Sequence, residues 1–281
     1  MNGGVMPGWR VIEVSRPRFW FYLAGPVIVG GIFGATTTAE LFSPIALVYL
    51  AYFLLPANVF LYGINDLYDA QIDRTNPKKT AYESRWEGRR STVAAVVLSA
   101  AGGLALTAAS APVAWAAMGG FLLLAWQYSA PPGRFKTTVV ADSVSNGLYI
   151  LPGVAIYAQL SGAVPPAAAI VGAWLWSMAM HTYSAIPDIG PDRAAGITTT
   201  ATWLGHRRTL WYCGVVWTVA AAAFAVIDLR WGVLMLLYPL LLVVWDRQGI
   251  PTARAYWYYP WINTAVGAVI ANAGLWGLLY G

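Results

Sequence analysis

Residues 44–73 of this chain read PIALVYLAYFLLPANVFLYGINDLYDAQID, in which an apolar run over 44–64 leads directly into one amide and three carboxylates. About 20 predominantly apolar residues are enough for an α-helix to cross the hydrocarbon core of a bilayer. We therefore expect a membrane-spanning helix over 44–64. The acidic side chains that follow it would then lie at one membrane surface.

The composition indicates a membrane protein along the whole chain. Of the 281 residues, 58% are hydrophobic and only 10% are charged, whereas a soluble domain carries about 25% charged residues. A lone cysteine, Cys213, excludes a disulfide-stabilised scaffold. The 15 Trp and 16 Tyr are residue types that concentrate at the two water–lipid interfaces. Soluble domains and disordered chains are therefore excluded.

Nine apolar stretches are candidates for spanning helices. They lie at about 19–38, 44–64, 92–110, 112–130, 138–160, 165–186, 209–227, 231–246 and 257–280. The stretch at 231–246 is short for a span, and residues 1–10 lack the pattern of a cleaved signal peptide. We expect an all-α, polytopic membrane protein in which residues 1–281 form a single transmembrane domain.

The basic residues predict an orientation, because cytoplasmic loops carry an excess of Lys and Arg. If the N-terminus is cytoplasmic and the nine helices alternate in direction, every basic residue except Arg230 falls on the cytoplasmic side. The net charge of +5 comes from short basic clusters between the apolar stretches, so it indicates topology and not a nucleic-acid partner. We expect a multi-pass protein of the cell membrane whose active site faces the cytoplasm.

Four oxygen-bearing side chains follow the second apolar stretch: Asn65, Asp66, Asp69 and Asp73. On a helix, Asn65, Asp69 and Asp73 fall within an arc of roughly 80°, and Asp66 lies close to Asp73. Like charges at this spacing repel each other, so a bound cation would stabilise the arrangement. Hard oxygen ligands of this kind suit Mg²⁺, which completes its shell with water and substrate phosphates. The alternative is a solvated acidic cluster, although such membrane flanks favour Lys and Arg.

A second acidic pair, Asp188 and Asp192, ends the sixth apolar stretch on the same expected side of the membrane. The surrounding Pro187, Gly190 and Pro191 argue against one continuous helix, so we expect a broken turn. Alone, such a pair commonly marks an ordinary turn. Together with the first cluster, it predicts an aspartate-lined cavity that holds a diphosphate through Mg²⁺.

Basic residues near the acidic sites are candidates for binding the diphosphate. Lys78 and Lys79 follow the first cluster, and Arg134 and Lys136 belong to the segment YSAPPGRFK, residues 128–136. Lys supplies a point charge and Arg a planar pair of donors for phosphate oxygens. The alternative for Lys78 and Lys79 is that they serve topology alone.

These motifs resemble those of the UbiA superfamily of intramembrane prenyltransferases. The pattern Asn65-Asp66-x-x-Asp69-x-x-x-Asp73 looks like its first aspartate-rich motif, and Asp188-x-x-x-Asp192 looks like its second. Residues 128–136 are similar to its third conserved element, and nine helices match its bundle. The resemblance covers nearly the whole chain.

A narrower likeness is to the lycopene elongase branch, in which five-carbon prenyl units are added to the ends of an acyclic carotenoid, with hydration in some members. It rests on residues 128–136, 142–153 and 184–188, with Thr198 and Thr199. Many other members of the superfamily carry Asp at the position of Ala185. The second metal site here is therefore poorer in carboxylates, and its number of Mg²⁺ ions is left open.

The resemblance implies dimethylallyl diphosphate as the donor and a lycopene-type carotenoid, dissolved in the lipid bilayer, as the acceptor. Asn65 would assist the set that holds Mg²⁺, namely Asp66, Asp69, Asp73, Asp188 and Asp192. The negative charge that develops as the C–O bond breaks would be stabilised by Arg134 and Lys136 with Lys78 and Lys79.

Aromatic residues are expected to shield the allylic cation from water. Tyr128 is the first candidate, and residues 148–157 with Trp174 or Trp176 are candidate walls for the acceptor. No base stands out. His181 and Asp142 are candidates, each with a plainer alternative: a structural histidine, and a partner of Lys136.

Two other functions compete with this interpretation. The acceptor could be an aromatic ring or a chlorophyll precursor, and a carboxylated aromatic acid would need a buried Arg such as Arg16 or Arg18. Alternatively, the chain could be an ion-coupled transporter. A transporter places its charges near the bilayer midplane, whereas the charges here gather at one surface, which favours the enzyme.

Overall fold

The computed structural model describes residues 7–73 and 90–281, with side chains for 11–68 and 90–281. It is 85% helical, and the described ranges contain no strand, which confirms the all-α prediction. The α-helices are α1 (Pro7–Val14), α2 (Trp20–Gly34), α3 (Thr38–Leu41), α4 (Pro44–Leu54), α5 (Pro56–Asp73), α7 (Arg90–Ala109), α8 (Trp115–Ser129), α9 (Ala141–Val144), α10 (Leu151–Ser161), α11 (Ala167–Ser184), α12 (Ile189–Ala194), α13 (Thr200–Leu204), α14 (His206–Ile227), α15 (Leu229–Met235), α16 (Leu237–Arg247) and α17 (Thr252–Tyr280). Short 3₁₀ helices lie at η1 (Pro17–Phe19), η2 (Pro112–Ala114), η3 (Phe135–Thr137), η4 (Ser145–Ile150) and η5 (Ile186–Asp188).

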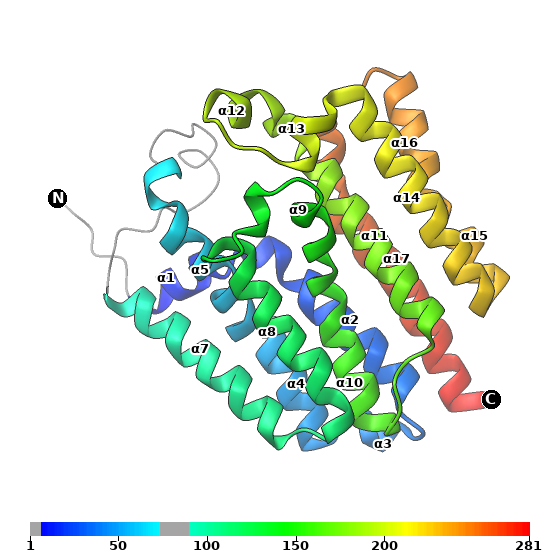
Figure 1. Ribbon diagram of the computed structural model, residues 1–281. Helices are drawn as coiled ribbons and strands as arrows, with labels where there is room; N and C mark the ends of the chain where they lie inside the picture. Colours follow the sequence, from blue (N-terminus) through cyan, green and yellow to red (C-terminus); the bar gives the residue numbers. More distant parts are fainter. Residues whose placement is uncertain (1–6, 74–89) are drawn as a thin grey trace.

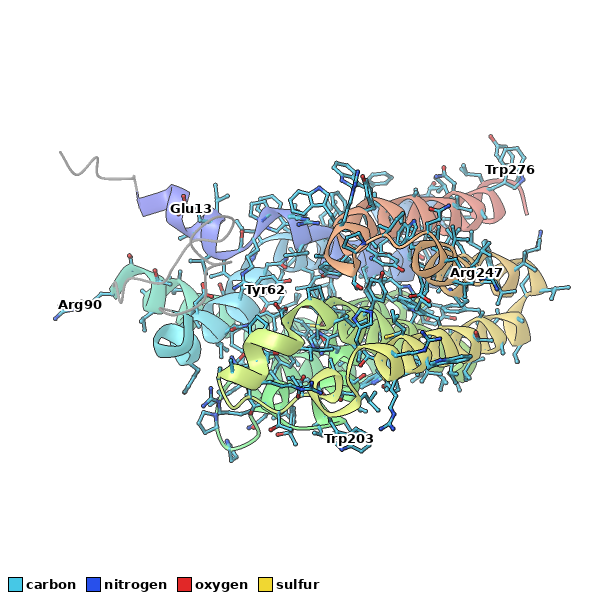
Figure 2. The ribbon with its side chains drawn as sticks, turned by 90° about the horizontal axis from the view of Figure 1, so that it is seen from above. Glu13, Tyr62, Arg90, Trp203, Arg247 and Trp276 are labelled. Atoms are coloured by element: carbon cyan, nitrogen blue, oxygen red, sulfur yellow. The ribbon has the colours of Figure 1, made fainter. Side chains whose placement is uncertain are left out.

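Five segments of the described chain are long and apolar enough to span a membrane: Pro44–Tyr68, Arg90–Ala109, His206–Ile227, Leu229–Arg247 and Thr252–Tyr280. They correspond to five of the nine expected spans, and the number nine stays a prediction. Large apolar side chains face outward, as a lipid environment requires. Figure 2 shows Trp203 and Trp276 at the outer surface and Tyr62 in the interior. The protein is therefore a multi-pass membrane protein.

The expected helix over 138–160 is interrupted. The segment folds as α9, then the 3₁₀ helix η4, then α10. The interruption coincides with a tertiary contact, because the indole Nε1 of Trp174 donates to the Val144 carbonyl at 2.9 Å. Gly147 packs so tightly against the Trp174 ring that a Cβ atom would overlap it. A contact with α11, which apolar periodicity cannot reveal, thus accompanies the local winding.

Close backbone contact joins α2 to α10. A Cβ atom on Gly30 would overlap the Gly153 carbonyl, and one on Gly34 would lie 2.8 Å from both Cα and O of Tyr157. Small residues allow such an approach between membrane helices. In Figure 1 these two helices lie side by side in the interior of the bundle.

The second half of the chain has a separate aromatic core. Tyr238 and Tyr259 stack with ring centroids 6.1 Å apart, and Trp217 lies 5.7 Å from each of them. All three side chains are almost completely buried. They come from α14, α16 and α17, and they hold these three helices together.

One end of the bundle gathers the segments expected to be cytoplasmic. Lys136 contacts Asn65, and Val140 donates its backbone N–H to Thr200 Oγ1 at 2.8 Å. Arg18 donates to the Trp257 carbonyl at 3.0 Å. Figure 1 shows α12 and α13 at this end and the C-terminus at the other. The described parts of these segments therefore lie at one end of the bundle, and the assignment of that end to the cytoplasmic side stays a prediction.

Arg230, the one basic residue expected on the other side, lies in the first turn of α15, just after the N-cap residue Asp228. Its guanidinium lies 2.6 Å from the carboxylate of Asp228, and its backbone N–H also donates to that group. These hydrogen bonds lower the pKa of Asp228 to about 2. Asp228 is therefore ionised at neutral pH, and the pair carries no net charge.

Candidate functional site

Asp66 is a buried carboxylate, 2% exposed, on the acidic face of α5. Its Oδ1 accepts a hydrogen bond from Arg16 Nη2 at 3.0 Å. The Arg16 guanidinium also lies over the ring of Tyr62, 4.7 Å from its centroid. Tyr62 stands one helical turn before Asp66, so the two residues share a face of α5. Arg16 itself has a left-handed backbone (φ 50°) just before η1.

Asn65, the neighbour of Asp66, contacts the predicted diphosphate-binding segment. Lys136 Nζ donates to Asn65 Oδ1 at 3.3 Å. Lys136 lies on η3, which begins directly after Arg134, a residue whose φ of 41° makes a left-handed turn. Gln127 supports this turn by accepting from Gly133 N at 2.7 Å. The structure thus places the end of α8 beside the acidic end of α5.

The second acidic motif is more regular than a broken turn. Helix α11 ends at Ser184, and Asp188 closes η5 while Asp192 lies in α12. Both aspartates are half-buried. Arg193 connects α12 to α13, since its Nη2 donates to the Thr202 carbonyl at 2.6 Å. The prolines do end the long helix as predicted, but the chain continues in two short helical turns.

Tyr128 is positioned by a histidine. Its hydroxyl lies 3.3 Å from His181 Nε2, and the two rings meet edge to face with centroids 5.8 Å apart. His181 is also close enough to Asp142 and Asp188 to interact electrostatically with both carboxylates. His181 therefore contacts Tyr128 directly and lies within electrostatic range of Asp142 and Asp188.

Asp142 caps a neighbouring helix. Its carboxylate accepts from the backbone N–H of Thr200 at 3.0 Å and from the Thr200 hydroxyl. It is 1% exposed. Thr200 is the first residue of α13, so this carboxylate satisfies a free N–H at a helix start. Asp142 has a structural role in addition to its proximity to His181.

Several predicted site residues lie outside the described part of the chain. Asp69 and Asp73 belong to α5, but their side chains are not described, and Lys78 and Lys79 lie within 74–89. Among the described side chains, no three His, Cys, Asp or Glu residues form a group able to hold a metal ion. A metal site that combines both aspartate motifs therefore stays a prediction.

A large apolar groove of about 1040 Å³ is lined at one end by Pro17 and Arg18, the residues that follow Arg16 in the chain. Its walls come from α2, α10, α11 and α14–α17, and its rim includes the exposed rings of Phe21 and Trp261. A row of tyrosines connects the groove to the Arg16–Asp66 pair. Tyr22 in the wall meets the ring of Tyr149 at 6.0 Å, and the hydroxyls of Tyr149 and Tyr62 are 3.3 Å apart.

Comparison with known proteins agrees with this architecture. The UbiA prenyltransferase family matches residues 23–257. The chain belongs to the UbiA prenyltransferase family. The protein is therefore an enzyme that transfers prenyl groups, and the transporter alternative is set aside.

Individual UbiA-family proteins resemble this chain over nearly its full length. The lycopene elongase/hydratase of Halobacterium salinarum is 55% identical over 269 residues, which are 95% of this chain and 98% of that protein. A UbiA homolog from Archaeoglobus fulgidus bound to GPP and Mg²⁺ has a TM-score of 0.77 at 23% identity, over 95% of this chain and 99% of that one. The same homolog bound to DMAPP and Mg²⁺ has a TM-score of 0.73 at 23% identity, over 94% and 98%. At this identity the likeness to the solved structures concerns the fold alone.

Sequence reasoning missed part of this UbiA-family site. The sequence alone assigns Arg16 to topology or to an aromatic acid, whereas in the structure its guanidinium pairs with Asp66. The tyrosine row was missed as well. One signal was available for Tyr62, because it lies four residues before Asp66 in the same helical stretch. No local signal could place Tyr22 or Tyr149 beside it.

Of the residues predicted to form walls for the acceptor, some line the groove and one does not. Trp176 lines the groove with Ile150, Gly153, Val154 and Tyr157, all from the predicted 148–157 stretch. Trp174 instead packs on Gly147 in η4 and donates to the carbonyl of Val144 at the end of α9.

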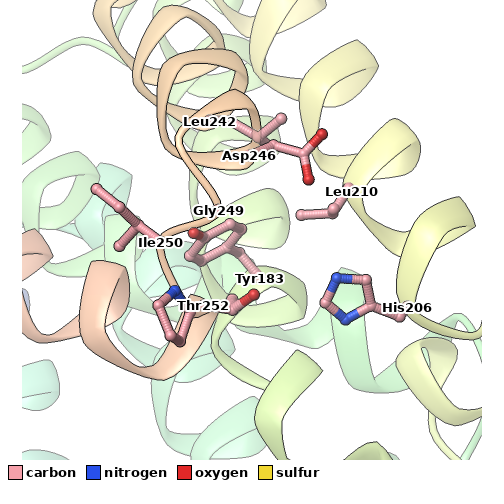
Figure 3. A pocket seen from close by; sticks show the side chains of 9 residues that line it. Tyr183, His206, Leu210, Leu242, Asp246, Gly249, Ile250 and Thr252 are labelled. Atoms are coloured by element: carbon pink, nitrogen blue, oxygen red, sulfur yellow. The ribbon is translucent and has the colours of Figure 1, made fainter.

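A second, smaller pocket of about 220 Å³ lies where α16 meets α17 (Figure 3). His206 and Asp246 border it, together with Tyr183 and the link between the two helices. None of the predicted site residues lines this pocket.

Proposed function

We propose that this chain transfers the prenyl group of dimethylallyl diphosphate to the ends of an acyclic, lycopene-type carotenoid. The observation that carries the proposal is the apolar groove. Arg18 is the only ionisable Asp, Glu, Lys, Arg or His side chain among the described residues that line it, and it stacks on Trp257 with its Cζ 3.6 Å from the ring centroid. A hydrocarbon acceptor needs no charged anchor, so such a groove suits a polyene.

Two kinds of related protein support this choice of donor and acceptor. Proteins named lycopene elongase/hydratase are about half identical to this chain, and an acyclic carotenoid is the substrate that this name states. The archaeal homolog that shares the fold binds DMAPP and Mg²⁺. The competing acceptor, a carboxylated aromatic acid, needs a buried Arg. Arg16 is already engaged by Asp66, and Arg18 is exposed and stacks on Trp257.

The proposed metal ligands are the carboxylates predicted from the motifs: Asp66, Asp69, Asp73, Asp188 and Asp192, with Asn65 assisting. Their chemistry fits Mg²⁺, because Asp66 is a buried oxygen donor and Asp188 and Asp192 are half-buried donors four positions apart. When bound, Mg²⁺ neutralises the diphosphate and so eases its departure.

The chain's own residues would perform the remaining tasks. Lys136 and Arg134, with Lys78 and Lys79, would bind the diphosphate oxygens and stabilise their charge as the C–O bond breaks. The tyrosine row would then face the allylic cation, and aromatic rings attract cations. A terminal alkene of the acceptor attacks this cation and forms the new C–C bond. The tertiary cation left on the acceptor loses a proton or gains water.

The placement of these parts also supports a proposal for topology. We place the acidic end of α5 and the segment 188–208 at the cytoplasmic surface, with the N-terminus on the same side. Residues 1–281 would act as one transmembrane domain.

The test supplies purified protein with dimethylallyl diphosphate, Mg²⁺ and either lycopene or 4-hydroxybenzoate, and separates the products by chromatography with mass detection. Elongated lycopene is expected. Prenylation of the aromatic acid alone would contradict the carotenoid acceptor and would leave the diphosphate site intact.

A further inference from the structure

The wall of the apolar groove contains three buried polar atoms with no hydrogen-bond partner among the described residues. They are Tyr22 Oη, Trp176 Nε1 and Asn263 Nδ2. All three residues line the groove, although they come from α2, α11 and α17. Buried polar groups in proteins are nearly always satisfied, so three of them in one apolar wall require an explanation.

Trp176 and Asn263 meet at Tyr238, and Tyr22 joins them through Asn263. The Tyr238 hydroxyl donates to Asn263 Oδ1 at 2.9 Å, and its ring meets that of Trp176 edge to face at 5.8 Å. Tyr22 lies within range of a polar interaction with Tyr256 and with Asn263, and Trp176 lies within such range of Tyr238. None of these pairs completes a hydrogen bond among the described residues. Because Tyr238 uses one end of the Asn263 amide, the other end needs a further partner whichever way the amide is turned.

The chemistry of the cluster matches one hydroxyl oxygen. The Trp176 indole and the Asn263 amide each supply an N–H donor, and the Tyr22 hydroxyl can accept. An alcohol or water oxygen has two lone pairs for the donors and a proton for the acceptor. These polar groups stand just beyond hydrogen-bond distance of their neighbours, which is the spacing that a bridging oxygen occupies. A hydrocarbon alone would leave them unbridged, which is costly in an apolar site.

We propose that Tyr22, Trp176 and Asn263 form a binding site for one hydroxyl oxygen in the groove wall. The oxygen belongs to a water molecule or to a tertiary alcohol at the end of the polyene. This inference rests on the proposed function, because it takes the groove as the acceptor site. Tyr22 also begins the tyrosine row that leads to Arg16 and Asp66, so the oxygen would lie near the reacting end of the acceptor.

The two sources of the oxygen imply different chemistry. A water molecule would form a C–O bond to the tertiary cation left after prenyl transfer and release one proton to solvent, which yields a neutral tertiary alcohol. A polyene that already carries a tertiary alcohol would be held by that group without any bond being made or broken.

The first measurement is binding, which needs no turnover. Purified protein is titrated with lycopene and with lycopene carrying one terminal tertiary hydroxyl, and quenching of tryptophan fluorescence gives each Kd. If the site takes the alcohol, wild-type protein binds the hydroxylated polyene about tenfold more tightly, the scale of one net hydrogen bond. Tyr22→Phe and Asn263→Leu then abolish the preference. Tyr22→Phe removes a single oxygen atom, so it separates the lost hydrogen bond from any effect on folding.

The second measurement is turnover of lycopene in H₂¹⁸O. If the site takes water, wild-type product contains ¹⁸O, and the same two variants lower the labelled fraction of the product about tenfold. Asn272→Leu is the matched control. Asn272 lines the same groove on the same helix, but its Nδ2 already donates to the Ala268 carbonyl at 2.8 Å, so both ratios should keep their wild-type values.

The outcomes separate the site from the proposed function. Equal binding of the two polyenes by the wild-type protein, together with a labelled fraction that the variants leave unchanged, would overturn the hydroxyl site. A protein that binds both polyenes but prenylates neither would overturn the proposed function instead, and the binding preference alone would then decide the site.

Discussion

Arg16 Nη2 and Asp66 Oδ1 lie 3.0 Å apart although 50 residues separate them in the chain. The Asp66 side chain is 3% exposed and that of Arg16 is 16% exposed. The pair therefore ties the segment before α2 to the acidic face of α5, away from bulk water. It also places a cation beside the first aspartate motif, where the proposed diphosphate would bind.

Replacement of Arg16 should destabilise the protein strongly. Arg16→Ala leaves the Asp66 carboxylate buried without this partner, and breaking a buried pair in this way costs about 3–5 kcal/mol. We expect a lower Tm for the detergent-solubilised variant, followed by intrinsic fluorescence. Arg18→Ala is the control. Arg18 is exposed and contacts Trp257, not a buried carboxylate, so its replacement should lower Tm much less. Equal Tm values for wild type and Arg16→Ala would show that the pair does not support the fold.

The first aspartate motif should be essential for prenyl transfer. Asp66→Asn, Asp69→Ala and Asp73→Ala should each lower kcat on the order of 10²-fold or more, the scale for removal of one preorganised charge-stabilising group. Removal of divalent ions with a chelator should abolish turnover, and added Mg²⁺ should restore it. A variant at Glu40, which lies at the far end of the bundle in α3, serves as control. Normal turnover by Asp69→Ala in saturating Mg²⁺ would remove that residue from the mechanism.

Packing of α2 on α10 should tolerate no added side-chain atoms at Gly30 or Gly34. A Cβ atom at either position meets backbone of α10, and backbone cannot yield as a flexible side chain does. We expect Gly30→Ala and Gly34→Ala to lower the unfolding free energy by about 1–3 kcal/mol through overpacking.

Gly119→Ala on α8 is the control for these variants, because its added Cβ meets nothing within 4 Å beyond the adjoining backbone of its own helix. It should be neutral or slightly stabilising, since Ala is the better helix former. Thermal unfolding in detergent measures all three variants, and an unchanged Tm for Gly30→Ala would contradict the observed contact.

The orientation in the membrane can be tested by cysteine labelling of intact cells. In a Cys213→Ala background, an impermeant thiol reagent should modify Ala39→Cys in α3 but not Arg208→Cys in α14. Both positions are exposed, so a difference in labelling reports the side of the membrane. Permeabilised cells, in which both positions should react, provide the control. The reverse pattern would invert the orientation proposed above.

Local sequence patterns were sufficient to predict a large part of the secondary structure of this protein. The helical class, the long helix that carries Asn65 to Asp73, and the end of the sixth helix before Asp188 follow from apolar runs and prolines. These features depend on neighbouring residues in the chain, since hydrophobic length and a missing N–H act within one helix. The two acidic motifs could be recognised from the sequence for the same reason, because a helical turn places residues four apart on one face.

Contacts between distant segments could not be derived from such patterns. The pairing of Arg16 with Asp66, the row from Tyr62 through Tyr149 to Tyr22, and the cluster of Tyr22, Trp176 and Asn263 each join helices far apart in the chain. The break at Gly147 accompanies its contact with Trp174 on another helix. In an apolar chain nearly every face of every helix is hydrophobic, so periodicity does not reveal which face turns inward. Close packing of one helix on another makes that choice, and it thereby selects which of the 16 tyrosines reach the site.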